Sequence, residues 1–211
     1  GPQSLDLIKQ ISKTNISELK YYNFIIGNIG EIKDVIISRT GYTGELGYEL
    51  YVKNSFVTNL WNLLFSTNIQ LKPIGLAARD TLRLEKGYCL YGNEINDFTS
   101  PIEADLTWIT KFNKNFVGKD IIHKVYKEGR TKKLVGIELL DKGIARKDYK
   151  IYSPTKQIEI GYVTSGTMSP SLNKPIAIGF VDIKYSDINT IVEISVRNKK
   201  IKSKVVNLPF I

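Results

Sequence analysis

Apolar and polar residues repeat with a helical period in the first part of the chain. Leu5, Ile8 and Ile11 recur every three or four residues, as on one side of a short helix that Ser4 is placed to cap. The same spacing continues from Phe56 to Leu60 and beyond. The pattern therefore predicts helices near residues 4–11 and 56–65, each with one apolar side.

A different period surrounds a glycine-rich turn. Residues 35–37 form a β-branched apolar run, which predicts a buried strand. The turn RTGYTGELGYEL follows at residues 39–50. Beyond it, Leu50 stands between Glu49 and Tyr51, and this alternation predicts a short strand with Glu49 and Tyr51 on one face.

A third helix is predicted to begin at Pro73 and to stop at Gly87. Arg79, Arg83 and Lys86 form a stripe on it between two apolar sides, so we expect the helix to pack on both. A buried charge without a partner costs several kcal/mol. Each arginine is therefore expected either to pair with an acid elsewhere or to meet a carboxylate or carbonyl of a ligand.

From residue 134 onward, short apolar runs are separated by turns, with no helical stretch between them. The runs are 134–140, 151–152, 158–164, 176–181, 191–196 and 201–206. The turn-rich stretch GYVTSGTMSPS at 161–171 is interpreted as a strand end followed by a hairpin. The pattern predicts a small barrel or sandwich. We thus predict an α+β domain at 1–129 followed by an all-β, barrel-like domain at 130–211.

Composition and charge narrow the function classes. The chain has 211 residues and a net charge of +9, carried by scattered lysines. This charge fits either a composition bias or an anionic partner, and no RRM, KH or zinc-finger signature accompanies it. The single cysteine, Cys89, and the single histidine, His123, leave no disulfide framework and no protein-only zinc site. We expect no metal, no membrane span and a reducing, cytoplasmic compartment.

Besides the arginines, Glu49 and Cys89 are candidates for chemistry. Glu49 is either a solvated strand residue or an acceptor for the N–H donors of a planar heterocycle, which Tyr42 and Tyr51 would flank with aromatic rings. Cys89 is interpreted as a buried small apolar residue, although its basic neighbours leave thiolate character open. No Ser/His/Asp set for hydrolysis is present.

Five stretches together resemble the aminomethyltransferase, or T-protein, family of the glycine cleavage system. They are RTGYTGELGYELYV (39–52), GLAARDTLRLEKGYCLYGNEI (75–95), TSPIEADLTWIT (99–110), FVGKD (116–120) and VTSGTMSPSLNKPIAIGFV (163–181). They occur in the order and at the spacing of that family, and the resemblance extends over essentially the whole chain.

The resemblance implies a reaction and its partners. The lipoyl-bearing H-protein would deliver an aminomethyl group, and tetrahydrofolate would accept the one-carbon unit, giving methylenetetrahydrofolate and ammonia. By match to the family motifs, folate would contact Tyr42, Glu49 and Arg79, and less firmly Tyr88, Trp108 and Arg146. It also implies a monomer. A basic surface would attract an acidic carrier and a polyglutamylated folate.

Departures from the family leave other readings open. The opening Gly1-Pro2-Gln3 matches a turn that follows the family's essential aspartate, so that catalytic residue is expected upstream and the fragment alone is expected to be inactive. A related family linked to iron–sulfur chemistry and tRNA modification carries a cysteine motif that 86–94 echoes loosely. A folate domain of a sarcosine- or dimethylglycine-type oxidase, and a basic nucleic-acid-binding module, are further alternatives.

Overall fold

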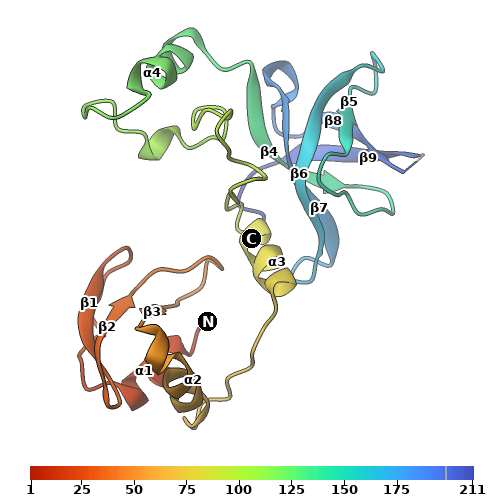
Figure 1. The fold of residues 1–211 in the computed structure, drawn as a ribbon. Helices are drawn as coiled ribbons and strands as arrows, with labels where there is room; N and C mark the ends of the chain where they lie inside the picture. The colour runs from red at the N-terminus through yellow and green to blue at the C-terminus, as the bar shows by residue number, and fades with distance from the viewer. Residues whose placement is uncertain (198) are drawn as a thin grey trace. The chain divides into compact units, whose positions relative to one another are not determined.

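The computed structural model describes residues 1–197 and 199–211. They form two compact units, Gly1–Leu82 and Arg83–Ile211 (Figure 1). The division falls inside a helix, and the first strand of the second unit's barrel begins at Lys132. The domain boundary expected near residue 130 stays a prediction.

The first unit is a small antiparallel sheet with two helices. The strands β1 (Phe24–Ile29), β2 (Ile32–Ser38) and β3 (Glu49–Tyr51) lie in the order β1-β2-β3. The helices are α1 (Ser4–Ile11) and α2 (Val57–Phe65), the latter preceded by a 3-10 turn at Asn54–Phe56. Their apolar sides pack on one face of the sheet, and the shared core contains Leu7, Ile8, Ile29, Val35, Ile37 and Leu60. Both helices, β2 and β3 were predicted, whereas β1 was not.

The pairing of β2 with β3 decides where Glu49 points. Ile37 pairs with Leu50, and Ser38 pairs with Glu49. Leu50 therefore packs with the core, while Glu49 and Tyr51 share the exposed face, as the alternation predicted. The predicted cap of α1 is wrong. Gln3 occupies the cap position without a side-chain bond, and Ser4 Oγ instead donates to the Leu46 carbonyl at 3.2 Å.

The helix α3 (Leu76–Glu85) ends as predicted but begins later. It starts at Leu76 rather than at Pro73. Gly87, at φ 70°, ends it in the left-handed region that favours glycine. Packing on both sides was expected along the whole helix, but only its last residues, Arg83 to Glu85, are buried, whereas Leu76 is 81% exposed.

The second unit is built on a closed antiparallel barrel with the strand order β4-β7-β6-β5-β8-β9 (Figure 1). The strands are β4 (Lys132–Leu139), β5 (Lys150–Tyr152), β6 (Glu159–Ser169), β7 (Lys174–Asp182), β8 (Ile191–Val196) and β9 (Lys199–Val206). Each of the predicted apolar runs is one of these strands, and closure decides for the barrel over the sandwich. The hairpin expected at 161–171 is also present, since β6 pairs with β7 as far as Ser169 and Lys174.

Helical segments of the second unit lie before the barrel and between its strands β7 and β8. They are a 3-10 turn at Thr107–Ile109, the unpredicted helix α4 (Lys119–Glu128) and a 3-10 turn at Ile183–Tyr185. Within the described parts of the chain, every helix is too short or too polar to traverse a lipid bilayer.

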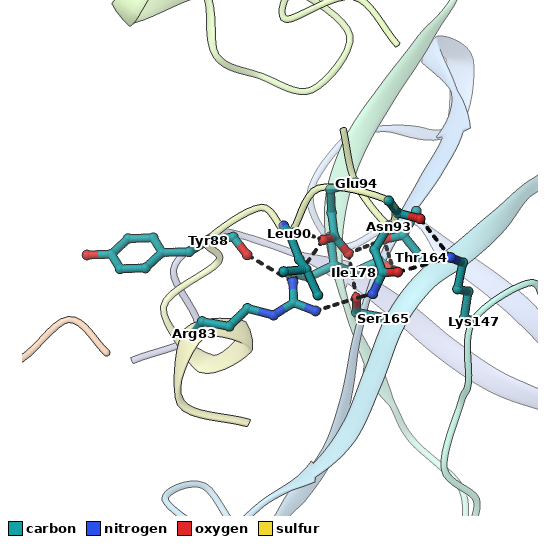
Figure 2. A network of polar contacts seen from close by, with 10 residues as sticks. Arg83, Tyr88, Leu90, Asn93, Glu94, Lys147, Thr164, Ser165 and Ile178 are labelled. Atoms are coloured by element: carbon teal, nitrogen blue, oxygen red, sulfur yellow. Dashed lines mark hydrogen bonds and ion pairs between the residues drawn. The ribbon is translucent and has the colours of Figure 1, made fainter. Parts of the chain in front are cut away.

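A buried ion pair lies between α3 and the barrel strand β6 (Figure 2). Arg83 and Glu94 are both completely buried, and Arg83 Nη1 lies 2.8 Å from Glu94 Oε2. The same nitrogen donates to the Tyr88 carbonyl at 2.9 Å, and Nη2 donates to Ser165 Oγ at 2.6 Å. Of the two uses predicted for an arginine of this helix, Arg83 thus has the first, a pair with an acid outside the helix.

Both oxygens of the Glu94 carboxylate are satisfied. Oε1 accepts from the hydroxyls of Thr164 and Ser165, each at 2.6 Å, and Oε2 also accepts from the Leu90 backbone N–H at 2.8 Å. Asn93 extends the network, because its amide donates to Ser165 Oγ at 3.1 Å and its oxygen accepts from Lys147 Nζ at 3.0 Å. A buried charge with its full set of partners avoids the cost of an unpaired one.

Replacement of Glu94 by Gln is expected to destabilise the second unit strongly. The change leaves the buried Arg83 guanidinium without a counter-charge, and losing one partner of such a pair costs about 3–5 kcal/mol. Urea unfolding followed by circular dichroism, together with amide hydrogen exchange on β6 and β7, measures the effect. Glu159→Gln, in the exposed pair with Lys150, is the matched control and should change little. Equal unfolding midpoints for the two variants would contradict this account.

Candidate functional site

A pocket of about 490 Å³ lies in the first unit, beside the glycine-rich turn. Its size is in the range of small-molecule sites, and its walls are mostly apolar. The apolar lining includes Leu7, Ile8, Leu50, Leu60, Leu64, Leu71 and Ile74; the polar lining includes Thr40, Tyr42, Thr43, Tyr48, Glu49 and Arg79. Three of the predicted site residues, Tyr42, Glu49 and Arg79, are therefore brought together in one pocket.

The glycine-rich turn forms one wall of this pocket. Thr40, Gly41, Tyr42 and Thr43 all line it. Gly44 has φ 75°, a backbone conformation that L side chains rarely adopt. This conformation returns the chain towards β3, so the turn contributes both a wall and the strand that carries Glu49.

The Glu49 carboxylate is held by two hydroxyl groups. Its Oε2 atom accepts hydrogen bonds from Thr40 Oγ1 and, at 2.9 Å, from the Tyr51 hydroxyl. The bond to Glu49 raises the pKa of Tyr51, because it favours the protonated phenol beside a carboxylate. Both hydroxyls bond the same carboxylate oxygen, which fixes the rotation of the group and leaves Oε1 available as an acceptor.

Arg79 is placed by an aromatic ring. Its guanidinium carbon lies 4.7 Å from the centre of the Tyr42 ring, which is a cation–π contact. Among residues 1–197 and 199–211, no hydrogen bond involves its side-chain N–H groups. A guanidinium oriented by a ring, with its donors unused, suits a carboxylate or carbonyl of a bound molecule.

The pocket combines complementary groups. It offers an oriented carboxylate acceptor, a cationic donor and the phenols of Tyr42 and Tyr48 over an apolar floor. Burial raises the pKa of Tyr48, with Arg39 partly offsetting the effect, so its hydroxyl stays protonated near neutral pH. These groups are chemically suited to a flat ring with N–H donors and an acidic or carbonyl-bearing extension. In the described residues, no cluster of three or more His, Cys, Asp or Glu side chains forms a metal site.

The other predicted residues belong to the second unit. The Tyr88 carbonyl accepts a hydrogen bond from Arg83. Trp108 lies in the turn at Thr107–Ile109, with 66% of its area exposed. Arg146 Nη1 donates to the Gly166 carbonyl at 2.9 Å. Their contact with a folate stays a prediction. The hydrogen bonds that Thr40 and the Tyr51 hydroxyl donate to Glu49 were not predicted from the sequence. The pairing of Ser38 with Glu49 places Thr40, two residues after Ser38, beside the Glu49 carboxylate. This strand register could not be predicted from the sequence.

Cys89 packs against the core of the second unit, as its apolar neighbours predicted. Burial raises the pKa of its thiol to about 11; Glu94 adds to this and Arg83 partly offsets it. Thiolate character had been left open because of nearby basic residues, but desolvation and a carboxylate outweigh them. A protonated, packed thiol is a structural residue rather than a poised nucleophile.

Two segments of the chain match models of known protein families. Residues 1–114 match the GCVT N-terminal domain, and residues 132–211 match the glycine cleavage T-protein C-terminal barrel domain. The chain belongs to the glycine cleavage T-protein family. The family resemblance seen in the five motifs is thereby confirmed, as is the order of an α+β part followed by a barrel.

Similar proteins match the chain over its full length. An aminomethyltransferase of Flavobacterium psychrophilum is 45% identical over 212 residues, and one of Halothermothrix orenii is 47% identical over 214 residues. The chain covers 59% of the length of each. The crystal structure of glycine cleavage system aminomethyltransferase T from Bartonella henselae superposes with a TM-score of 0.89 at 31% identity, over 98% of this chain and 56% of that one.

The Cys89 thiol is expected to react slowly with disulfide reagents while the chain is folded. A rise in pKa from 9.0 to about 11 lowers the thiolate fraction at pH 8 about a hundredfold relative to the unfolded chain. Because the folded state favours the protonated thiol, its contribution to stability is full below pH 9 and declines as the pH rises towards 11. Reaction rates with an aromatic disulfide between pH 7 and 10, with and without urea, test this. Equally fast modification of the folded chain would contradict it.

Proposed function

We propose that the complete protein is the aminomethyltransferase of a glycine cleavage system. It transfers the one-carbon unit of an aminomethyl group, held on the lipoyl carrier H-protein, to tetrahydrofolate, and releases ammonia. Membership of the T-protein family and the names of the similar proteins support this proposal. The chain spans about three fifths of the length of those proteins, 59%.

The observation that carries the proposal is the convergence of Glu49 and Arg79 on one pocket. We assign to Glu49 the N–H groups of the pterin ring, because its fixed carboxylate leaves an acceptor oxygen available. Arg79 is assigned to a carbonyl or carboxylate of the folate, and Tyr42 both orients Arg79 and lines the pocket. The apolar floor favours the body of the folate over water.

The remaining parts of the proposal concern residues and partners outside this pocket. Tyr88, Trp108 and Arg146 are proposed as weaker folate contacts. The family's essential aspartate is expected to lie outside residues 1–211, and residues 1–211 alone are proposed to be inactive. We propose a cytoplasmic monomer that needs no metal, with its net charge of +9 attracting an acidic carrier and a polyglutamylated folate.

Glu49→Gln and Arg79→Ala are each expected to weaken tetrahydrofolate binding by more than tenfold in the complete protein as its gene encodes it. Each change removes a hydrogen bond to a charged group, worth about 1.5–3 kcal/mol. Isothermal titration calorimetry gives the dissociation constants. The exposed residues Glu18 and Lys33 supply the charge-matched controls Glu18→Gln and Lys33→Ala. Unchanged affinity in both site variants would remove the assignment of the pocket.

Thr40→Val is expected to weaken the same binding about three- to tenfold, because the Glu49 carboxylate loses one of the hydroxyls that hold it. Valine keeps the shape of threonine without the hydroxyl, and Thr40→Ser, which restores the hydroxyl, should recover most of the affinity. Titrations of both variants with tetrahydrofolate make the comparison. If valine and serine weaken binding equally, the loss comes from packing and the positioning role of Thr40 is wrong.

A further inference from the structure

A second pocket, of about 590 Å³, lies on the barrel of the second unit. Its walls come from the connection between β4 and β5 and from the neighbouring ends of β8 and β9. The lining consists of Lys142, Gly143, Ile144, Arg146, Tyr149, Val196, Arg197, Lys199 and Ile201. Four of these side chains are cationic, and no aspartate or glutamate of the described residues lines the pocket.

The cations of this pocket differ from other lysines of the barrel. Lys150, Lys174 and Lys200 each lie within 4.0 Å of a carboxylate, on Glu159, Glu138 and Glu193 respectively. In the described parts of the chain, Lys142, Arg197 and Lys199 form no ion pair or side-chain hydrogen bond. Clustered like charges without counter-charges raise the local positive potential, and an anion relieves their repulsion.

The backbone brings the cationic side chains to one place. Gly166 allows the connection at residues 143–146 to approach β6 closely, since a Cβ there would lie 2.4 Å from the Ala145 carbonyl oxygen. Arg146 then anchors one nitrogen on the Gly166 carbonyl at 2.9 Å, which leaves its other N–H groups for a ligand. From the other side, β8 ends at Val196 and β9 begins at Lys199, so Arg197 and Lys199 reach the same hollow.

Part of the pocket lining is apolar. Val196 and Tyr149 pack against the barrel core, and Ile201 belongs to it. The lining therefore combines apolar and cationic side chains in one concave pocket. That combination suits a small molecule with an apolar or aromatic body and several negative groups.

We propose that this barrel pocket, defined by Lys142, Arg146, Arg197 and Lys199, binds a small polyanion carrying phosphate or carboxylate groups. Its lining shares no residue with the pocket beside the glycine-rich turn, and Arg146, proposed above as a weaker folate contact, belongs to it. The negative groups of such a molecule could be phosphates or carboxylates, so one probe of each kind is used.

Calorimetric titration of the complete protein with tripolyphosphate and with citrate tests the site. We expect saturable binding of one molecule of at least one probe, and the stronger probe identifies the preferred acid group. Arg197→Gln combined with Lys199→Gln should weaken that binding at least tenfold. Lys202→Gln combined with Lys204→Gln, the same loss of charge on β9 outside the pocket lining, should change it less than twofold.

Amide chemical shifts locate the bound anion independently of the variants. Gly143 and Ile201 line the pocket and should shift with either binding probe, whereas amides of β1 and β2 should not. Three results would overturn the proposal: no saturable binding of either probe, equal weakening by the two double variants, or binding of an acidic protein or a nucleic acid at this surface without binding of either small anion. Thermal melts confirm that both variants remain folded.

Discussion

The ion pair between Arg83 and Glu94 is the constraint on which the second unit depends. It unites the end of a helix, an otherwise irregular loop and two adjacent residues of β6, Thr164 and Ser165, around a single carboxylate. The loop packs Cys89 and Ile95 against the core of its unit. The Glu94 carboxylate adds a stricter constraint, because any departure leaves a guanidinium or a carboxylate buried without a partner.

The two arginines of α3 show how one sequence pattern leads to different uses. Arg83 is completely buried and donates hydrogen bonds within the protein, to Glu94, Tyr88 and Ser165. Arg79, one turn earlier, lines a pocket, and its guanidinium lies over the ring of Tyr42. Identical residue types four positions apart thus divide between a structural role and one suited to a ligand.

The sequence predicted those features that depend on local periodicity. The barrel strands, α1, α2 and the shared face of Glu49 and Tyr51 all follow from the spacing of apolar residues. β1 was missed because Gly27 interrupts its apolar run, at a site where a Cβ would meet Thr14 at 2.4 Å. The partners Glu94 and Thr40 were missed for a related reason. Each lies in a turn or loop, where the path of the backbone, not a repeat, decides which side chain it meets.

Closure of the barrel has a consequence for how the two units behave in solution. The strand order closes on itself, so in the described residues each barrel strand has a neighbouring strand on both sides. The three-stranded sheet, by contrast, has two open edges, and Phe24, Ile26, Ile36 and Tyr51 are exposed on its strands. Isolated from its natural neighbours, the first unit is therefore the part prone to aggregate, while the barrel should stay dispersed.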